Sequence, residues 1–225
     1  MGEGIAEVLT FAVGVAVSPV PIIAVILMLF SARARVNGPM FLLGWVAALA
    51  IVSFAAYFAA DAGDPSTSSG ASDTISWGTL VLGALMLALA ARNWRNRPAP
   101  GAQPDMPRWM DGIEDLEPGK ALGLGLLLAG VNPKNLILTV GASTGLAQLG
   151  PDTADAVVSL IVFVAIGSLT IAVPVAYYLL GGRGARAALD GLKAWLTTHN
   201  DAVMAVLFLV FGVKLIAEAI PPLTG

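Results

Sequence analysis

Residues 121–146 read ALGLGLLLAGVNPKNLILTVGASTGL, an apolar run whose centre is interrupted by the polar motif NPKN at 132–135. The run is long enough to cross the hydrocarbon core of a bilayer, which takes about 20 residues of helix. A proline removes a backbone donor and clashes with the preceding turn, so we expect two half-helices that break near the membrane midplane. Residues 5–30 show the same pattern around the motif SPVP at 18–21.

The composition of the whole chain favours a membrane protein. Of its 225 residues, 57% are hydrophobic and 12% are charged, and the mean hydropathy is +0.82. A soluble domain carries roughly twice that share of charge. The expected fold class is an all-α integral membrane protein with six transmembrane helices. The six apolar runs, two of them interrupted, are 5–30, 39–60, 76–94, 121–146, 154–180 and 201–219.

An inverted repeat is expected because the first three runs resemble the last three. The first and fourth runs break at a small polar residue followed by proline, the second and fifth end in Ala-Tyr-aromatic, and the third and sixth share a Val-x-Gly step. Three is an odd number, so the second copy would enter the membrane in the opposite direction, which is typical of transporters. The predicted organisation is one membrane domain, with a first repeat at 1–94, a cytoplasmic linker at 95–120 and a second repeat at 121–225.

The placement of lysine and arginine predicts the orientation of these helices. Basic residues gather around the connections after the first, third and fifth runs, and the other two connections contain none. The positive-inside rule then places the three basic loops in the cytoplasm and both termini on the outer side of the plasma membrane.

Three further patterns concern the surfaces of the helices. Residues 184–198 carry an apolar stripe at helical spacing, which allows either an interfacial helix lying on the membrane or a helix packed on the protein. Trp94, Trp109 and Trp195 are expected to be anchors at the membrane interface. The glycines within the runs are expected to be helix-packing positions, namely Gly14, Gly44, Gly83, Gly125, Gly130, Gly141 and Gly167.

The two breaks form the candidate substrate-binding site. Each new half-helix begins near a proline, and its N-terminus carries unpaired amide donors and a partial positive charge. The first run enters the membrane and the fourth leaves it, so both N-termini are expected to meet near the midplane, an arrangement suited to an anion. Ser18 and Asn132 are expected to be the N-caps. The candidate substrate-binding residues are Ser18, Pro19, Pro21, Asn132, Pro133, Lys134 and Asn135.

Lys134 is the most distinctive residue of this site. It lies near the centre of the fourth run, where a charge costs a few kcal/mol, and no Asp or Glu occupies the central part of any run. We therefore expect Lys134 to contact the substrate or a transported proton, because a buried lysine can lose its proton. The structural alternative for Lys134 is a side chain that snorkels towards the interface. The structural alternative for the two breaks is a simple proline kink.

Several functional classes find no support in the sequence. The chain has no cysteine and a single histidine, so disulfides and thiolate metal sites are excluded. No nucleophile–histidine–acid set, phosphate loop or cluster of metal ligands is recognisable. We expect a protein that is not an enzyme, has no cofactor or metal, and does not bind nucleic acid.

The motif SPVP at 18–21, Trp109 before a short acidic stretch, and the block NPKNL at 132–136 resemble the GAP family. These are the glycopeptidolipid- and sulfolipid-addressing proteins of mycobacteria and other actinobacteria, placed in the LysE superfamily of transporters. The resemblance covers essentially the whole chain, and NPKNL is its most specific part. It implies a six-helix LysE-type fold in a bacterial plasma membrane and a role in moving cell-envelope lipids.

The leading functional hypothesis is a transporter that exports or flips an anionic cell-envelope lipid or amphiphile, with membrane lipids as partners. One alternative is an exporter of amino acids or other small solutes, although simple cation export is disfavoured because the runs lack acidic coupling residues. A second alternative is a non-transporting scaffold of a lipid-export complex that docks through residues 95–119. Small residues on several helix faces also allow a homodimer.

Overall fold

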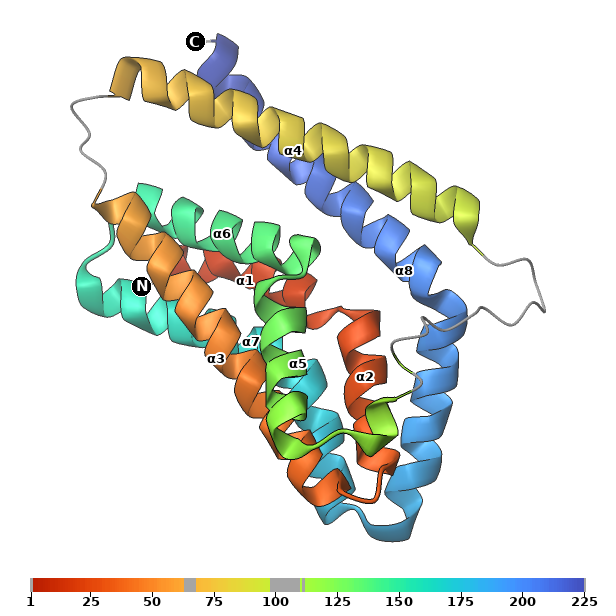
Figure 1. The fold of residues 1–225 in the computed structure, drawn as a ribbon. Coiled ribbons are helices and arrows are strands. Elements are labelled where there is room, and N and C mark those ends of the chain that lie inside the picture. The colour runs from red at the N-terminus through yellow and green to blue at the C-terminus, as the bar shows by residue number, and fades with distance from the viewer. Residues whose placement is uncertain (1, 63–67, 98–109, 111, 225) are drawn as a thin grey trace. The chain divides into compact units, whose positions relative to one another are not determined.

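The computed structural model describes residues 2–62, 68–97, 110 and 112–224. Within these residues the regular structure is entirely helical, as the sequence predicts (Figure 1). A short 3-10 turn, η3, covers Ile113–Asp115. The α-helices are α1 (Gly2–Ala16), α2 (Pro19–Phe30), α3 (Ala34–Asp61), α4 (Ser68–Asn96), α5 (Pro118–Gly130), α6 (Pro133–Gln148), α7 (Thr153–Leu180) and α8 (Gly182–Thr224).

The chain divides into two compact units. The first comprises residues 1–62 and 106–195, which hold α1 to α3, η3, α5 to α7 and the first part of α8. The second comprises residues 63–105 and 196–225, which hold α4 and the remainder of α8. Within the second unit α4 and α8 approach closely at the two predicted Val-x-Gly steps, because a Cβ on Gly83 would lie 3.0 Å from the carbonyl oxygen of Gly212.

Both predicted breaks are present, and each is a bend between two helices. The axes of α1 and α2 differ by 55°, and those of α5 and α6 by 61°. Pro19 and Pro133 are the first residues of α2 and α6. This is the position where the missing amide of proline removes no helical hydrogen bond. The local chemistry of proline therefore explains where both helices restart.

Three helical segments of the described chain are long and apolar enough to cross a membrane, namely α3, α7 and residues 184–217 of α8. The count rises to five if each bent pair, α1–α2 and α5–α6, is one span. The predicted third run is present as the helix α4, which is not among these spans. The described residues thus support a multi-pass membrane protein and do not confirm six spans.

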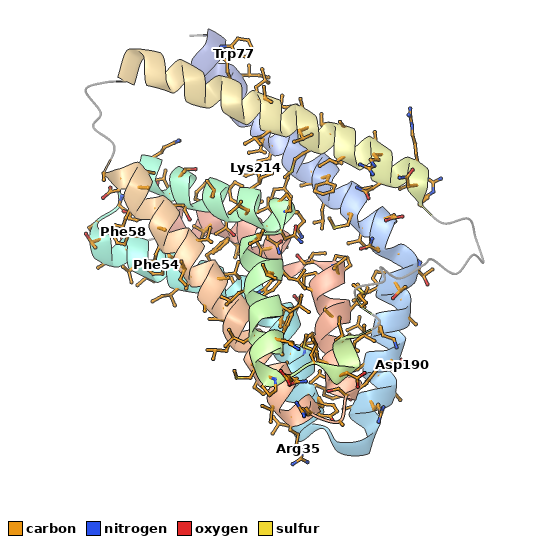
Figure 2. All side chains as sticks on the ribbon, viewed as in Figure 1. Arg35, Phe54, Phe58, Trp77, Asp190 and Lys214 are labelled. Atoms are coloured by element: carbon orange, nitrogen blue, oxygen red, sulfur yellow. The ribbon has the colours of Figure 1, made fainter. Side chains whose placement is uncertain are left out.

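Apolar side chains on the outer faces of α3 and α7 are consistent with a lipid environment. Ile51 is 65% exposed and Val173 is 59% exposed. Figure 2 shows Phe54 and Phe58 along α3, where Phe58 is 47% exposed. A soluble protein rarely exposes apolar faces of this extent.

The prediction of a separate surface helix at 184–198, followed by a distinct sixth run, is wrong in its boundaries. Both belong to the single 43-residue helix α8. The sequence between them contains neither proline nor glycine, the residues that usually end a helix, so the helix continues. Arg186 and Lys193 place their charged groups 5.1 and 5.3 Å from the ring centre of Phe30, at the end of α2. These contacts support the alternative in which this stretch packs on the protein.

The predicted interface anchors are only partly described. Trp94 is 52% exposed and Trp195 is 51% exposed, as an anchor at an interface requires. Trp109 lies outside the described residues.

The first unit is held together by close helix crossings at glycines. A Cβ added to Gly44 of α3 would overlap the carbonyl oxygen of Leu122 in α5, and one added to Gly125 would overlap the carbonyl oxygen of Phe41. These glycines are packing positions, as predicted. Elsewhere α1 packs along α7, where Gly167 faces Val15.

Candidate functional site

The ammonium group of Lys134 lies at the junction of the two broken helices. Lys134 is the second residue of α6 and is 5% exposed. Its Nζ donates hydrogen bonds to the carbonyl oxygens of Gly14 (2.8 Å) and Val17 (2.7 Å) and to Oγ of Ser18 (2.8 Å). An ammonium has three donors, so all of them are used by the end of α1 and the start of α2. Lys134 therefore does not snorkel towards an interface.

Two further carbonyls at the end of α1, those of Val15 and Ala16, also accept hydrogen bonds from side chains. The last carbonyls of a helix have no partner inside the helix, and in lipid each unsatisfied group costs several kcal/mol. Oγ of Ser18 donates to the carbonyl oxygen of Val15 (2.6 Å), and Oγ1 of Thr170 in α7 donates to that of Ala16 (2.6 Å). Together with Lys134, these groups allow a helix to end inside the protein without water.

The two predicted N-caps behave differently. Oδ1 of Asn132 accepts a hydrogen bond from the backbone amide of Lys134 (3.1 Å), so the cap of α6 is confirmed. Ser18 occupies the N-cap position of α2 but makes no capping bond there, and the prediction of a Ser18 cap is wrong. Pro21 lacks one of the two amides from which a capping side chain accepts a hydrogen bond, and the hydroxyl of Ser18 donates to the carbonyl oxygen of Val15 in α1 instead.

Pro19 and Pro21 reduce the number of free donors at the start of α2. Ile22 donates its amide to the carbonyl oxygen of Ser18 (3.2 Å), and Pro19 and Pro21 have none. Only the amide of Val20 is left in the first turn of α2. The positive charge at this junction therefore comes mainly from Lys134.

The structure brings together four of the seven predicted site residues. Ser18, Lys134 and Asn135 form one cluster, in which Oδ1 of Asn135 lies 3.1 Å from Oγ of Ser18. Asn132 caps α6, the helix that carries Lys134 and Asn135. Pro19, Pro21 and Pro133 define the starts of the two helices. A binding role for these seven residues stays a prediction.

Sequence reasoning missed the acceptors of Lys134 and the contribution of Thr170. Every residue carries a backbone carbonyl, so nothing in the sequence distinguishes those of Gly14 and Val17. A threonine in the middle of an apolar run was the available signal for Thr170. Within the described residues, the buried hydroxyls of Thr139 and Ser168 have no hydrogen-bond partner.

Thr170→Val is expected to lower the free energy of unfolding by about 1 kcal/mol, because it removes one side-chain hydrogen bond to a buried carbonyl while keeping the shape. This corresponds to a fall in Tm of roughly 2–4 °C for a chain of this size, measured by thermal unfolding in detergent. Thr144→Val is the matched control, since Thr144 bonds only to carbonyls of its own helix. An equal fall in both variants would contradict the assignment.

Two surface cavities lie away from this cluster. One, of about 470 Å³, is lined by Phe30, Arg186, Ala187 and Asp190. The other, of about 420 Å³, is lined mainly by η3 and α5, with Ile113, Leu116, Lys120 and Leu124 among its residues. Neither is lined by a predicted site residue.

A family model described as Sap, sulfolipid-1-addressing protein, matches residues 8–221. The chain belongs to this family. The Sap match extends across both helix breaks and the Lys134 cluster, and it agrees with the sulfolipid-addressing part of the resemblance. No curated protein and no solved structure matches the chain. The wider LysE assignment rests on the resemblance alone.

Proposed function

We propose that this Sap-family chain is a membrane transporter, rather than an enzyme, that exports or flips an anionic cell-envelope lipid across a bacterial plasma membrane. In this proposal Lys134 binds the anionic headgroup. The family supports a role in lipid or sulfolipid addressing. The observation that carries the transporter assignment is a buried lysine, bonded to oxygens of an unwound segment, at the junction of two broken helices.

The hydrogen bonds of Lys134 suggest how headgroup binding would be coupled to movement. All three donors of the ammonium are used by Gly14, Val17 and Ser18, so an anion can be bound only if some of these bonds are exchanged. That exchange releases the end of α1 from the start of α6. An anionic headgroup would then favour a state in which the two broken helices separate.

The inverted repeat is part of this proposal. The first copy would hold α1 to α4 and the second α5 to α8, each with a bend of similar size between its first two helices. A two-fold axis that exchanges the copies converts the packing of α3 on α5 into the packing of α7 on α1, and both packings are present. The proposal also includes a LysE-type fold, in which the basic loops lie in the cytoplasm and both termini lie outside.

Buried hydroxyls support a polar route next to Lys134. Thr139 follows Asn135 by one turn on α6, is 1% exposed and has no hydrogen-bond partner among the described residues. Buried polar groups without a hydrogen-bond partner are uncommon, and a bound water or ion is one of the explanations for them. A headgroup that moves along α6 would contact the hydroxyl of Thr139.

Native mass spectrometry tests the proposal. The wild type, Lys134→Arg and Lys134→Gln are purified and incubated with a total lipid extract from the source organism. We expect the wild type to retain one anionic lipid class, Lys134→Arg to retain part of it, and Lys134→Gln to lose roughly ten-fold or more in affinity, which corresponds to about 1.4 kcal/mol.

Lys120→Gln is the matched control, because Lys120 is exposed and lies outside the cluster. Absence of a selectively retained anionic lipid in the wild type, or equal retention by Lys134→Gln, contradicts the proposal and favours small-solute export or a scaffold. Deletion of residues 98–109 separates these alternatives, since a scaffold that docks through this segment would lose function while a transporter would keep it.

A further inference from the structure

We propose that the break between α1 and α2 is a binding site for a monovalent cation of ammonium size, a site that the ammonium of Lys134 fills in this structure. The class of ligand is a primary ammonium, ammonium itself or potassium. The inference concerns the oxygens of the break and not the transported lipid, so it stands independently of the function proposed above.

The geometry is that of a cation surrounded by oxygens. Three oxygens, from Gly14, Val17 and Ser18, lie 2.7–2.8 Å from Nζ of Lys134, within the range of about 2.7–2.9 Å for hydrogen bonds of a cationic donor. Two of them are backbone carbonyls at the C-terminal end of a helix, where the helix dipole places partial negative charge. Carbonyls at unwound helix ends coordinate cations in several transporters.

The cluster also contains more acceptors than donors. Nδ2 of Asn135 donates to the carbonyl oxygen of Leu128 (2.9 Å), which turns Oδ1 of Asn135 towards Oγ of Ser18 at 3.1 Å. The hydroxyl of Ser18 has a single proton to donate. It donates this proton in the shorter contact, to the carbonyl oxygen of Val15 (2.6 Å). No proton therefore lies between Oγ of Ser18 and Oδ1 of Asn135. Oδ1 of Asn135 is a further oxygen that faces the cluster.

Removal of Lys134 would leave these oxygens buried without a donor, which is unfavourable in an apolar surrounding. A small cation that enters from solution would restore the missing interactions. The same exchange would accompany any state in which Lys134 turns towards another ligand, so movement of this side chain would be linked to binding of a monovalent cation.

The test is chemical rescue of Lys134→Ala. Propylammonium contains the atoms that this substitution deletes, three carbons and the ammonium nitrogen. We expect the Tm of purified Lys134→Ala in detergent to rise saturably with propylammonium, by roughly 3–6 °C at ten times Kd. Ammonium and potassium chloride should give smaller rises at the same ionic strength, relative to choline chloride, whose cation is too large for the cluster.

The controls separate a cation site from general salt effects and from cavity filling. The wild type, whose site is filled, and Lys120→Ala, which alters an exposed lysine, should show no propylammonium-dependent rise. Neutral 1-propanol should not stabilise Lys134→Ala. In the double variant Ser18→Ala/Lys134→Ala, the affinity for propylammonium should fall several-fold because one of the oxygens is lost.

A Tm of Lys134→Ala that is indifferent to all three cations, or that responds equally to 1-propanol, overturns the inference. If Lys134→Ala cannot be purified, the same comparison is made on a fluorescent fusion extracted from membranes and run on size exclusion. A monodisperse peak recovered with propylammonium and not with choline supports the site, and its absence under both conditions contradicts it.

Discussion

Gly125→Ala is expected to abolish or severely impair folding, whereas Gly123→Ala, in the same helix, should be tolerated. A Cβ on Gly125 would overlap the carbonyl oxygen of Phe41 and lie 2.9 Å from the backbone nitrogen of Trp45. These are backbone atoms of α3, so the two helices would have to separate rather than repack a side chain. We expect a loss of at least about 3 kcal/mol, at the upper end of what overpacking costs.

Gly123→Ala is the control, and it is expected to change the stability in the opposite direction. A Cβ there meets nothing within 4 Å, and alanine is a better helix former than glycine by roughly 0.5–1 kcal/mol. The measurements are the yield of monodisperse protein in detergent and the Tm of each variant. Gly44→Ala, on the other side of the crossing, should reproduce the loss. A Gly125→Ala protein as stable as Gly123→Ala would show that α3 and α5 do not cross there.

Lys134→Met is expected to lower the free energy of unfolding by roughly 2–4 kcal/mol, because it leaves the carbonyls of Gly14 and Val17 buried without a donor. Relief from burying a charge opposes this loss. However, removing one partner of a buried charged interaction is destabilising on balance, since the other partner stays unsatisfied. The carbonyl oxygen of Gly14 lies in a buried hydrogen bond and that of Val17 in a partly buried one, so we expect the unsatisfied acceptors to dominate. The same variant should lose binding of the anionic lipid.

Thermal unfolding of Lys134→Met and Lys120→Met in the same detergent checks this expectation. Among the described residues, Lys120 forms an exposed ion pair with Glu117, 3.8 Å apart, and such pairs contribute about 0–1 kcal/mol. The Tm of Lys134→Met should therefore fall by roughly 5–15 °C, and that of Lys120→Met should change little. A Lys134→Met protein with the Tm of the wild type would mean that the end of α1 does not depend on Lys134.

Predictions that rest on local chemistry agree well with the structure. Proline at the start of a helix acts on its own turn, so Pro19 and Pro133 indicated both breaks, and Asn132 caps the helix that it precedes. The prediction of a Ser18 cap failed because Pro21 lacks one of the two amides that could donate to the cap, and the hydroxyl of Ser18 donates to the carbonyl oxygen of Val15 instead. The prediction of a separate surface helix failed because no residue between 198 and 201 ends the helix, which continues as α8.

The sequence by itself determined that the chain is apolar, helical and broken at two proline motifs, because composition and proline act through solvent transfer and local backbone geometry. It also marked Lys134 as a buried charge without a carboxylate partner. Only the tertiary structure decided which atoms receive that charge. The partners lie more than 100 residues away and are mainly backbone carbonyls, which are chemically alike at every position. Their selection depends on where α1 ends beside α6, and that is a property of how the helices pack.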